Sequence, residues 1–370
     1  MATGGGNERS TGIDDPLPLK MIYTALMLPR AVGHVRHRRS RCKPAARSPG
    51  MACTCRCLAH DYLVCTAWDN SVSLYAFQKN GFAIQSRAEM QMTQNPHTGP
   101  VLGACWDNMG TKVFTASADK QGKVWDLGSQ QVIQFAQHEQ PIKCVHWVDP
   151  HSMVVTASWD RTIKYWPSNS LGSGTPAATV TLPERVYAMD VRDNIAVVAT
   201  ADKNIHVFDI RANPQQPMKT HLSPLRHQVR TVALFSDNRG YAIGSIEGRV
   251  QIYHIQDSDQ GKNFAFKCHR DARNQDIYAV NAIVFHKLHG TFCTAGSDGT
   301  FNFWDKDAKQ RLKGFQQLPN AITCCDFNHT GDVFGYAVGY DWSKGYDAQN
   351  RQMESLWLHP IQDNEIRPKK

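Results

Sequence analysis

Two histidine–aspartate pairs in the chain combine residue types and a spacing that acid–base chemistry could use. His97 precedes Asp119 by 22 residues, and His138 precedes Asp160 by the same interval. A carboxylate that holds an imidazole can orient a catalytic base, and a fully satisfied buried network of the same groups can instead specify a fold. A catalytic pair is needed once, whereas this pair recurs along the chain. The recurrence therefore favours a structural role.

A threonine and a tryptophan accompany the acids at constant intervals. In three segments the acid follows the threonine by four residues and precedes the tryptophan by six. These sets are Thr115, Asp119 and Trp125; Thr156, Asp160 and Trp166; and Thr294, Asp298 and Trp304. We expect each set to form a hydrogen-bonded network, with His97 and His138 as the imidazole members of the first two.

The same acid-to-aromatic interval marks a repeat that runs through most of the chain. Weaker copies are Asp69 with Tyr75, Asp202 with Phe208 and Glu247 with Tyr253, and a seventh acid, Asp341, lacks the aromatic. The seven acids follow one another at intervals of 50, 41, 42, 45, 51 and 43 residues. A repeat of this length with a Trp-Asp ending is typical of WD-repeat blades, each a four-stranded antiparallel sheet. The sequence therefore predicts an all-β, seven-bladed WD-repeat β-propeller across residues 51–365.

The residues of one blade show how its strands would assemble a network. We expect residues 101–106 to form the innermost strand, 112–116 the second and 123–126 the third. Neighbouring strands run antiparallel. The loop that holds His97 and the turn that holds Asp119 would therefore lie at the same end of the ring.

The N-terminal segment is expected to close the ring. In this fold the last sheet usually borrows its outer strand from the N-terminus, upstream of the first innermost strand, which we place at residues 51–57. Residues 21–28 have the β-branched and aromatic content that suits such a strand. The remainder of residues 1–50 would be a basic, poorly ordered extension, and residues 366–370 a short basic tail.

Charge is distributed unevenly along the 370 residues, whose formal net charge is +8. Residues 16–60 hold nine lysines and arginines and no acid, residues 1–15 sum to −2, and the other 310 residues carry +1. This distribution excludes a uniformly basic nucleic-acid-binding domain but leaves room for a local basic patch. A basic cluster at residues 34–41 fits a nuclear localisation signal. The longest apolar run, residues 21–29, is shorter than a membrane-spanning helix requires.

Cysteine usage and missing motifs argue against catalysis and bound cofactors. The 11 cysteines, an odd number, lie mostly in apolar runs, as reduced core residues do. Cys53, Cys55 and Cys57 alternate and would need a fourth ligand, such as His60, to bind zinc, so a buried strand face is favoured. The chain has no evident nucleophile–base–orienter set and no phosphate-binding glycine motif. We therefore predict a protein that is not an enzyme and has no cofactor.

Longer motifs carry a resemblance to one family of propellers. They are HTGPVL at 97–102, SIEGRV at 245–250, FKCHR at 266–270, DIYAVN at 276–281, FWDKDA at 303–308 and YDWSKG at 340–345. In this order they resemble the WD-repeat messenger-RNA export factor family of the nuclear pore, over roughly residues 60–365. The resemblance implies an adaptor in the nucleus and at the nuclear envelope that shuttles to the cytoplasm. Its expected partners are the GLEBS hairpin of a GLFG-repeat nucleoporin and RNA, bound directly or as ribonucleoprotein.

A sister family leaves a second function open. The kinetochore checkpoint WD-repeat proteins share the SIEGR and FKCHR motifs and bind GLEBS-like peptides of kinases, so these motifs imply either family. The FWDKDA and YDWSKG motifs, together with LPER at 182–185, resemble the export factors more. Residues 1–50 match neither family and lack the Gly-, Ser-, Thr- and Phe-rich start expected of an export factor. We favour export, with a checkpoint and spindle scaffold as the alternative.

Basic and aromatic side chains near the fifth and sixth blades are candidate binding residues. Lys309, Arg311 and Lys313 alternate and would project from one face of an outer strand, with Lys306 in the turn before them. Such groups beside exposed aromatics suit single-stranded nucleic acid or an acidic peptide. Lysines on an outer strand can equally serve only to discourage aggregation.

The remaining candidates extend this region toward the loops of the ring. Lys267 is expected to project away from Phe266, and Arg249 to begin a third strand at the end of the ring where His97 lies. Trp342 has no packing role set by the repeat and would suit a partner contact. The full candidate set is Arg249, Phe266, Lys267, Trp304, Lys306, Lys309, Arg311, Lys313 and Trp342.

Overall fold

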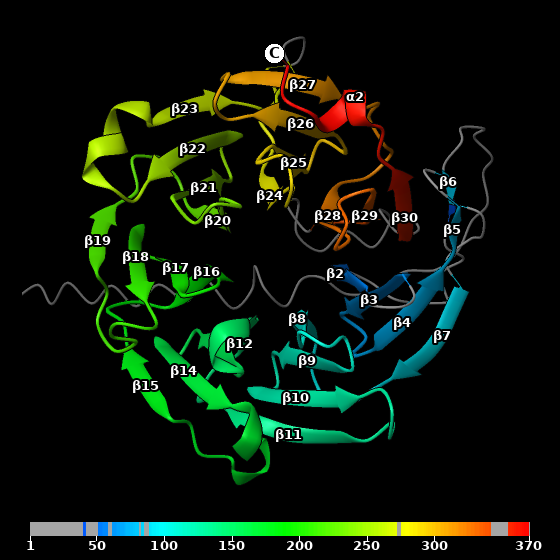
Figure 1. Cartoon of the computed structure of the whole chain (residues 1–370), viewed down its shortest axis with the longest axis vertical. Coiled ribbons are helices and arrows are strands. Elements are labelled where there is room, and N and C mark those ends of the chain that lie inside the picture. The colour runs from blue at the N-terminus through cyan, green and yellow to red at the C-terminus, as the bar shows by residue number, and fades with distance from the viewer. Residues whose placement is uncertain are drawn as a thin grey trace, which may run out of the picture.

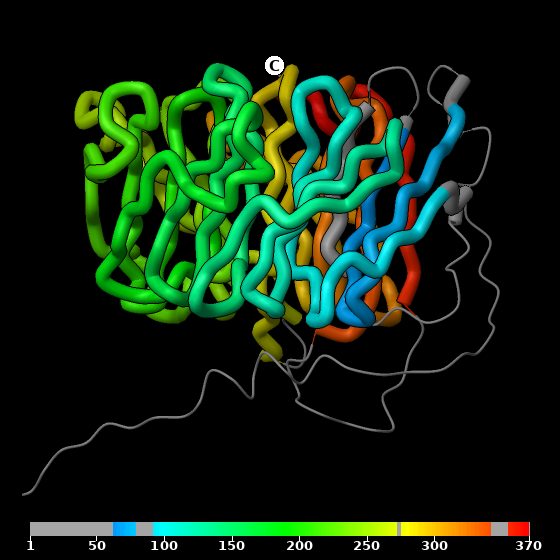
Figure 2. The backbone as a smooth tube through the Cα atoms, turned by 90° about the horizontal axis from the view of Figure 1, so that it is seen from below, coloured from blue at the N-terminus to red at the C-terminus, as the bar shows by residue number. Residues whose placement is uncertain are grey.

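Seven four-stranded antiparallel sheets surround a central axis in the computed structural model (Figure 1). The model describes residues 40–41, 51–57, 61–80, 83–84, 89–271, 275–341 and 354–369. Seen edge-on, the strands of each blade run through the thickness of the disc and their connecting turns lie on its two faces (Figure 2). The predicted seven-bladed β-propeller is confirmed.

Each blade takes its strands in chain order from the innermost to the outermost, apart from the last. Blade one contains β2 (Met51–Cys57), β3 (Asp61–Ala67), β4 (Val72–Phe77) and β7 (Glu89–Gln94), with a small hairpin of β5 (Lys79–Asn80) and β6 (Ala83–Ile84) between the last two. Blade two contains β8 (Val101–Trp106), β9 (Lys112–Ser117), β10 (Gln121–Asp126) and β11 (Val132–Gln137). Blade three contains β12 (Ile142–Val148), β13 (Met153–Ser158), β14 (Thr162–Pro167) and β15 (Ala178–Thr181).

Blades four to seven repeat this order. Blade four contains β16 (Val186–Arg192), β17 (Ile195–Thr200), β18 (Asn204–Asp209) and β19 (Lys219–Leu222). Blade five contains β20 (Val229–Leu234), β21 (Gly240–Ser245), β22 (Arg249–His254) and β23 (Phe264–Lys267). Blade six contains β24 (Val280–Phe285), β25 (Phe292–Gly296), β26 (Phe301–Asp305) and β27 (Gln310–Gly314). Blade seven contains β28 (Ile322–Phe327), β29 (Val333–Val338), β30 (Ser355–Pro360) and β1 (Ser40–Arg41).

Helices occupy only short connections in the described chain. Three 3-10 turns lie at η1 (Asp149–His151), η2 (Ser168–Ser173) and η3 (Asp257–Lys262), and one α-helical turn, α2 (Asp363–Ile366), follows the last strand. None of the described helices is long and apolar enough to cross a membrane.

The last blade takes its fourth strand from upstream of blade one. In β1, Ser40 and Arg41 pair with Leu358 and Trp357 of β30. The segment predicted for this role, residues 21–28, lies outside the described residues, and the fourth position of the sheet is held by β1. The closing strand β1 therefore ends at Arg41, shortly before β2 begins at Met51 in the chain.

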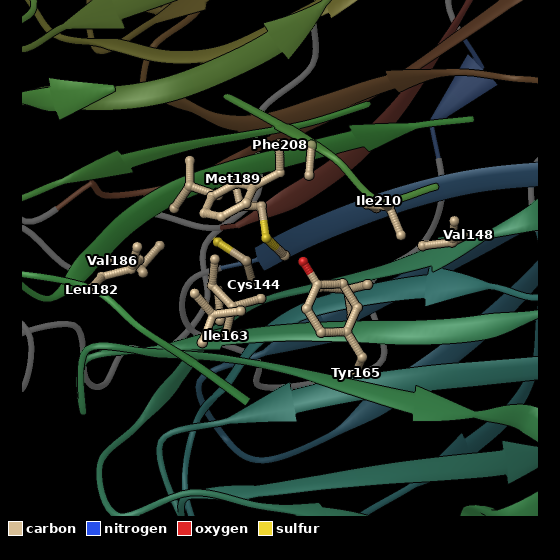
Figure 3. Close-up of a cluster of buried hydrophobic side chains, with 14 residues drawn as sticks. Cys144, Val148, Ile163, Tyr165, Leu182, Val186, Met189, Phe208 and Ile210 are labelled. Carbon is tan, nitrogen blue, oxygen red and sulfur yellow. The ribbon is translucent and has the colours of Figure 1, made fainter. Parts of the chain in front are cut away.

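The hydrophobic core lies between neighbouring blades, not inside any one of them. Figure 3 shows the cluster between blades three and four, where Cys144 and Met189 of the inner strands meet Tyr165 and Phe208. Strands in such a stack are buried on both faces, which explains runs of Val, Ile and Phe without strict alternation. Burial raises the pKa of Cys144 to about 11, so this thiol is protonated and packs as a small apolar group.

The C-terminal helix is part of the propeller and corrects one predicted boundary. Ile366, assigned by the sequence to a basic tail, is buried against blades six and seven. Its carbonyl accepts a hydrogen bond of 2.8 Å from Thr291 Oγ1. The helix carries its own ion pair, with 2.8 Å between Arg367 Nη2 and Asp363 Oδ2. The packed part of the chain therefore extends past residue 365.

A buried histidine beneath this helix makes stability depend on pH. His286 bonds through Nε2 to the carbonyl of Gly331 at 3.0 Å, and its Nδ1 accepts the backbone N–H groups of Leu288 and His289. The ring is therefore neutral in the folded protein. Burial, and then the charge of nearby His289, lower the pKa of His286 to about 4.

Acidification is expected to weaken the fold through His286. The unfolded chain binds this proton near the ordinary value of 6.5, so unfolding takes up a proton between that pH and 4, and stability falls as the pH falls. One such group is worth about 2 kcal/mol at pH 4.5. Urea unfolding at pH 7 and 4.5 should show a smaller pH dependence for His286→Gln than for the wild type. An unchanged dependence would contradict the assignment.

Candidate peptide and nucleic-acid interface

The histidine-centred network of blade three is complete and buried. His138 Nδ1 lies 2.8 Å from Asp160 Oδ2, and its Nε2 lies 2.8 Å from Thr156 Oγ1. Trp166 donates its indole N–H to the same threonine oxygen at 2.8 Å. The four residues link β13, β14 and the turn between them to the loop that precedes β12, as the spacing predicts.

Blade six holds a second complete network, and its histidine is His269. This ring bonds to Asp298 Oδ1 at 2.9 Å and to Thr294 Oγ1 at 3.0 Å, and Trp304 Nε1 donates to Thr294 at 2.9 Å. The sequence prediction did not assign His269 to the network. It precedes the acid by 29 residues, whereas the other two histidines precede theirs by 22, because a longer loop enters this blade.

The network of blade two lacks one expected bond. His97 contacts Asp119 at 2.9 Å and Thr115 at 2.8 Å. The missing bond is the one from the indole of Trp125 to Thr115, because the indole N–H of Trp125 has no hydrogen-bond partner among the described residues. The Thr115 hydroxyl donates to the carbonyl of Lys123 at 3.0 Å. Trp125 therefore contributes to this blade by packing alone.

Electrostatics identifies these networks as structural. Burial alone would raise the pKa of Asp160, but hydrogen bonds from His138 and Thr162 lower it well below the usual range. Burial lowers the pKa of His138 despite the nearby carboxylate. The pair is therefore a neutral imidazole and an ionised carboxylate at neutral pH. His138 is 1% exposed, so a substrate cannot reach the ring, and an acid–base role is excluded for this pair.

The other acids of the repeat also accept hydrogen bonds at their turns. Asp202 accepts from Thr200 Oγ1 and from Asn204, and Glu247 accepts the backbone N–H of Arg226. In the last blade, Asp341 accepts a hydrogen bond from Ser297 Oγ. The weaker sequence copies thus keep the acid as an acceptor at the turn.

A cluster of half-buried aromatic rings faces the gap between blades five and six. Phe266 on β23 lies 4.6 Å from Trp304 on β26, measured between ring centroids, and 6.0 Å from Phe264. Lys309 places its ammonium 5.1 Å from the centre of the Phe264 ring. We call these four residues, with Lys306, the side patch. It combines aromatic faces with positive charge, as the sequence predicts for this region.

Lys306 is more enclosed than its predicted role implies. Its side chain is 9% exposed, and its ammonium lies 5.1 Å from the ring centre of Phe235 and 2.8 Å from Asp307 Oδ1. Cation–π contact and the ion pair both hold the group against the blade. Lys309, which is exposed, is the accessible cation at this end of the side patch.

The basic stripe predicted along the outer strand of blade six is split between two faces. Lys309 precedes β27, in a turn with φ of 54°. A register shift then pairs Arg311 with Trp304 but Lys313 with Phe303. Adjacent residues of β26 point to opposite faces of the sheet. Arg311 and Lys313 therefore cannot share a face, and the prediction of one alternating stripe is wrong.

Each member of that set has its own neighbours. Arg311 follows Trp304 toward blade five, whereas Lys313 lies on the blade-seven side with Glu365 of α2. Burial would raise the pKa of Glu365, but its hydrogen bond with His359, that ring's charge and, further, the charge of Lys313 lower it. Of the three predicted stripe residues, Lys309 and Arg311 face the gap that contains the side patch, and Lys313 does not.

The upper face, which carries the loops of His97, His138 and His269, displays apolar side chains over blades four to six. Leu222 is 61% exposed, Ile246 39% and Ile277 51%. All three lie at strand ends or turns beside these loops. Exposed apolar groups that gather on one face mark interaction surfaces.

Two predicted binding residues belong to this end of blade five. Arg249 pairs with Lys267 in the β22–β23 ladder, and its Nε lies 3.5 Å from Glu247 Oε2. Lys267 is exposed and points away from half-buried Phe266, as predicted. Lys306 contacts Phe235 at the opposite end of β20, so Arg249 and Lys306 do not form one site. Trp342 lies outside the described residues.

The described residues contain no group of three or more His, Cys, Asp or Glu side chains placed to hold a metal ion. Cys53, Cys55 and Cys57 do lie on one strand, β2, as expected. Their side chains and His60 are outside what the structure describes.

Comparisons with known proteins place these features in a family. The WD domain, G-beta repeat family matches residues 88–126, 129–167 and 263–305, which are the three segments with the clearest acid-to-tryptophan repeats. The chain is 48% identical to mRNA export factor GLE2 of Chaetomium thermophilum, over 84% of this chain and 85% of that protein. It is 45% identical to the Poly(A)+ RNA export protein of Schizosaccharomyces pombe, over 84% and 87%. Protein Rae1 of Drosophila melanogaster is 42% identical, over 84% and 89%. With this identity over 84% of its length, the protein belongs to the WD-repeat family of mRNA export factors.

Proposed function

We propose that the chain is a non-enzymatic adaptor for messenger-RNA export at the nuclear pore. It docks the GLEBS hairpin of a GLFG-repeat nucleoporin on its upper face and holds RNA at the side patch. The side patch is the observation that carries the RNA part of the proposal. Two of the relatives are named for RNA export, and these names support a role for this chain in messenger-RNA export. The chain acts in the nucleus and at the nuclear envelope and shuttles to the cytoplasm.

The side patch has the chemistry that single-stranded nucleic acid requires. Phe264, Phe266 and Trp304 offer half-buried ring surfaces, and Lys309 adds an exposed charge 5.1 Å from one of those rings. Bases stack on aromatic side chains without regard to sequence, while cations track the phosphates. The body of the protein is nearly neutral, so this local patch, not overall charge, provides the attraction.

The upper face suits an extended peptide better than a small molecule. Leu222, Ile246 and Ile277 project from separate blades, so a partner must span several blades to cover them. Arg249 begins β22 at this end of blade five and can meet an acidic side chain of the partner. A hairpin that orders on binding needs a large contact surface to offset its ordering cost. A ring of short loops supplies such a surface.

Calorimetry with two peptides tests the docking proposal. A synthetic nucleoporin GLEBS peptide should bind tightly and raise the melting temperature through binding linkage. A GLEBS-like peptide from a checkpoint kinase should bind more weakly. A clear preference for the kinase peptide would assign the chain to a checkpoint and spindle scaffold, and binding of neither peptide would refute the adaptor.

A matched pair of variants locates the peptide on the upper face. Ile246→Asp with Ile277→Asp should weaken GLEBS binding by at least about tenfold, since each change replaces an apolar contact with a charge. Leu288→Asp is the control, because Leu288 is 74% exposed but follows β24 at the opposite end of the ring. Equal losses in both proteins would contradict docking on the upper face. The predicted role of Trp342 can be measured in the same assay.

A further inference from the structure

A cavity of about 360 Å³ opens at the upper end of blade six, beside His269 and Asp298 of that blade's network. Arg270, Arg311, Thr300, Asn302 and Phe315 line it. Asn302 precedes Trp304 by two residues on β26, so both residues lie on the same face of the strand. The cavity therefore continues the side patch toward the upper face of the ring.

Two guanidinium groups meet at this cavity without a carboxylate partner among the described residues. Arg270 donates from Nη2 to the carbonyl of Glu247 at 2.8 Å and, more weakly, from Nε to that of Gly248 at 3.4 Å. These bonds fix the group and leave its other N–H donors for a ligand. Arg311 is exposed, and the described residues offer it no hydrogen bond or ion pair. Fixed guanidinium forks suit phosphate oxygens.

The acid at the cavity wall does not cancel this charge. Asp298 accepts hydrogen bonds from His269, from the backbone N–H of Thr300 at 3.0 Å and from its hydroxyl at 2.8 Å. Burial would raise the pKa of Asp298, but these bonds, led by that of His269, lower it. The carboxylate is thus ionised and already satisfied. Two arginines against one satisfied carboxylate leave the cavity with a net positive charge.

A glycine keeps the cavity open. A Cβ placed on Gly314 would lie 3.1 Å from Asn302 Oδ1 and 3.5 Å from Arg311 Cζ. A β-carbon at this position would therefore press on the Asn302 amide and reach van der Waals contact with the Arg311 guanidinium. The glycine therefore leaves space beside the Asn302 amide and the Arg311 guanidinium, both of which line the cavity.

We propose that this cavity binds a phosphate group of single-stranded RNA whose neighbouring bases stack on the side patch. Arg270 and Arg311 grip the phosphate oxygens, and Asn302 contributes a polar contact. The proposal rests on the RNA-binding role of the side patch. It adds a second contact, at which a phosphate of the RNA is held at the upper end of blade six. A phosphate here also sets the path of the strand, from Lys309 at the lower end of blade six to Arg270 at the upper end.

Two variants on one strand test the proposal. Arg311→Gln and Lys313→Gln remove the same charge from β27, but only Arg311 lines the cavity. Binding of a single-stranded oligouridylate is measured by fluorescence anisotropy at several salt concentrations. Arg311→Gln should reduce the slope of log affinity against log salt by about 0.7, the value for one lost phosphate contact on a single strand. Lys313→Gln should leave the slope unchanged.

A third variant changes the shape of the cavity and leaves its charge intact. Gly314→Val should fill the wall beside Arg311 and weaken oligouridylate binding about as much as Arg311→Gln. Its melting temperature controls for folding, and the GLEBS peptide controls for the upper face. Loss of RNA binding with both controls intact supports the cavity.

The outcomes separate this proposal from the wider function. If Lys309→Glu weakens RNA binding while Arg311→Gln and Gly314→Val behave like Lys313→Gln, the cavity is not the phosphate site and the side patch stands. If Lys309→Glu also has no effect, the RNA part of the proposed function fails as well. If a phosphoserine peptide binds through Arg311 and oligouridylate does not compete, the cavity serves a protein partner and the proposal is overturned.

Discussion

Replacing Asp160 with alanine is expected to lower the free energy of unfolding by about 3–4 kcal/mol, because the change leaves the buried His138 ring and half-buried Thr162 without their acceptor. His138 Nδ1 lies 2.8 Å from this carboxylate, the N–H groups of Glu139 and Thr162 donate at 3.0 and 2.9 Å, and the Thr162 hydroxyl donates at 2.6 Å. The lost carboxylate is also the charge that holds the loop before β12 to the turn before β14. Equilibrium urea unfolding gives the value.

Asp126→Ala is the matched control for this prediction. The Asp126 carboxylate also accepts hydrogen bonds from backbone N–H groups, from Gly128 at 3.1 Å and from Ser129 at 2.9 Å. These donors are exposed to solvent, so they bind water when the carboxylate is lost. Asp126→Ala should lower the free energy of unfolding by less than about 1 kcal/mol. Similar losses in Asp126→Ala and Asp160→Ala would show that the network does not hold blade three together.

Reversing both cations that face the gap between blades five and six is expected to weaken RNA binding by about a hundredfold. Lys309→Glu with Arg311→Glu removes two phosphate contacts and places two acids beside the aromatic rings, so attraction becomes repulsion. The salt dependence should also fall, by about 1.4 in slope for two contacts on a single strand. Anisotropy with labelled oligouridylate measures both quantities.

The structure supplies a control with the same change in charge. Lys267→Glu with Lys313→Glu alters β23 and β27, the outer strands of blades five and six, on the faces that point away from the side patch. Deleting residues 1–39 is a second control, since that basic segment can attract RNA by itself. A similar loss from both double variants would mean that general charge, not the side patch, provides the affinity.

The repeat could be predicted from sequence because buried polar groups must be satisfied in every blade that uses them. The constant intervals in Thr156, Asp160 and Trp166 follow from the register of two antiparallel strands and the turn between them. Packing between blades then requires apolar residues on both faces of the strands. These constraints act within about 30 residues and are visible in one chain.

Features that depend on loop length or on a break in register could not be read in the same way. His269 was missed because a longer loop separates it from Asp298. The split of Arg311 from Lys313 depends on a bulge in β27, and the placement of Lys309 depends on a positive φ before the strand. Neither the bulge nor the positive φ has a signature in the amino-acid composition of the segment. A single alternation rule therefore placed three cations on one face when they occupy two.

Contacts between blades were also beyond the sequence pattern. Arg270 lies in a motif that sequence analysis used only to compare families, yet it meets Arg311 from the neighbouring sheet. Phe235 directly follows the inner strand of blade five, and its ring lies against Lys306 of blade six. Side chains about 40 to 70 residues apart in the chain form these sites, and only the closure of the ring brings them together.

The most direct test of the export role is the distribution of polyadenylated RNA in cells depleted of this protein. In situ hybridisation with an oligo(dT) probe should show accumulation in the nucleus after depletion. Re-expression of the wild type should restore the cytoplasmic signal, and the Lys309→Glu, Arg311→Glu protein should not. An unchanged distribution of polyadenylated RNA after depletion, accompanied by a failure to arrest when the spindle is disrupted, would contradict the export role and assign the chain to checkpoint signalling.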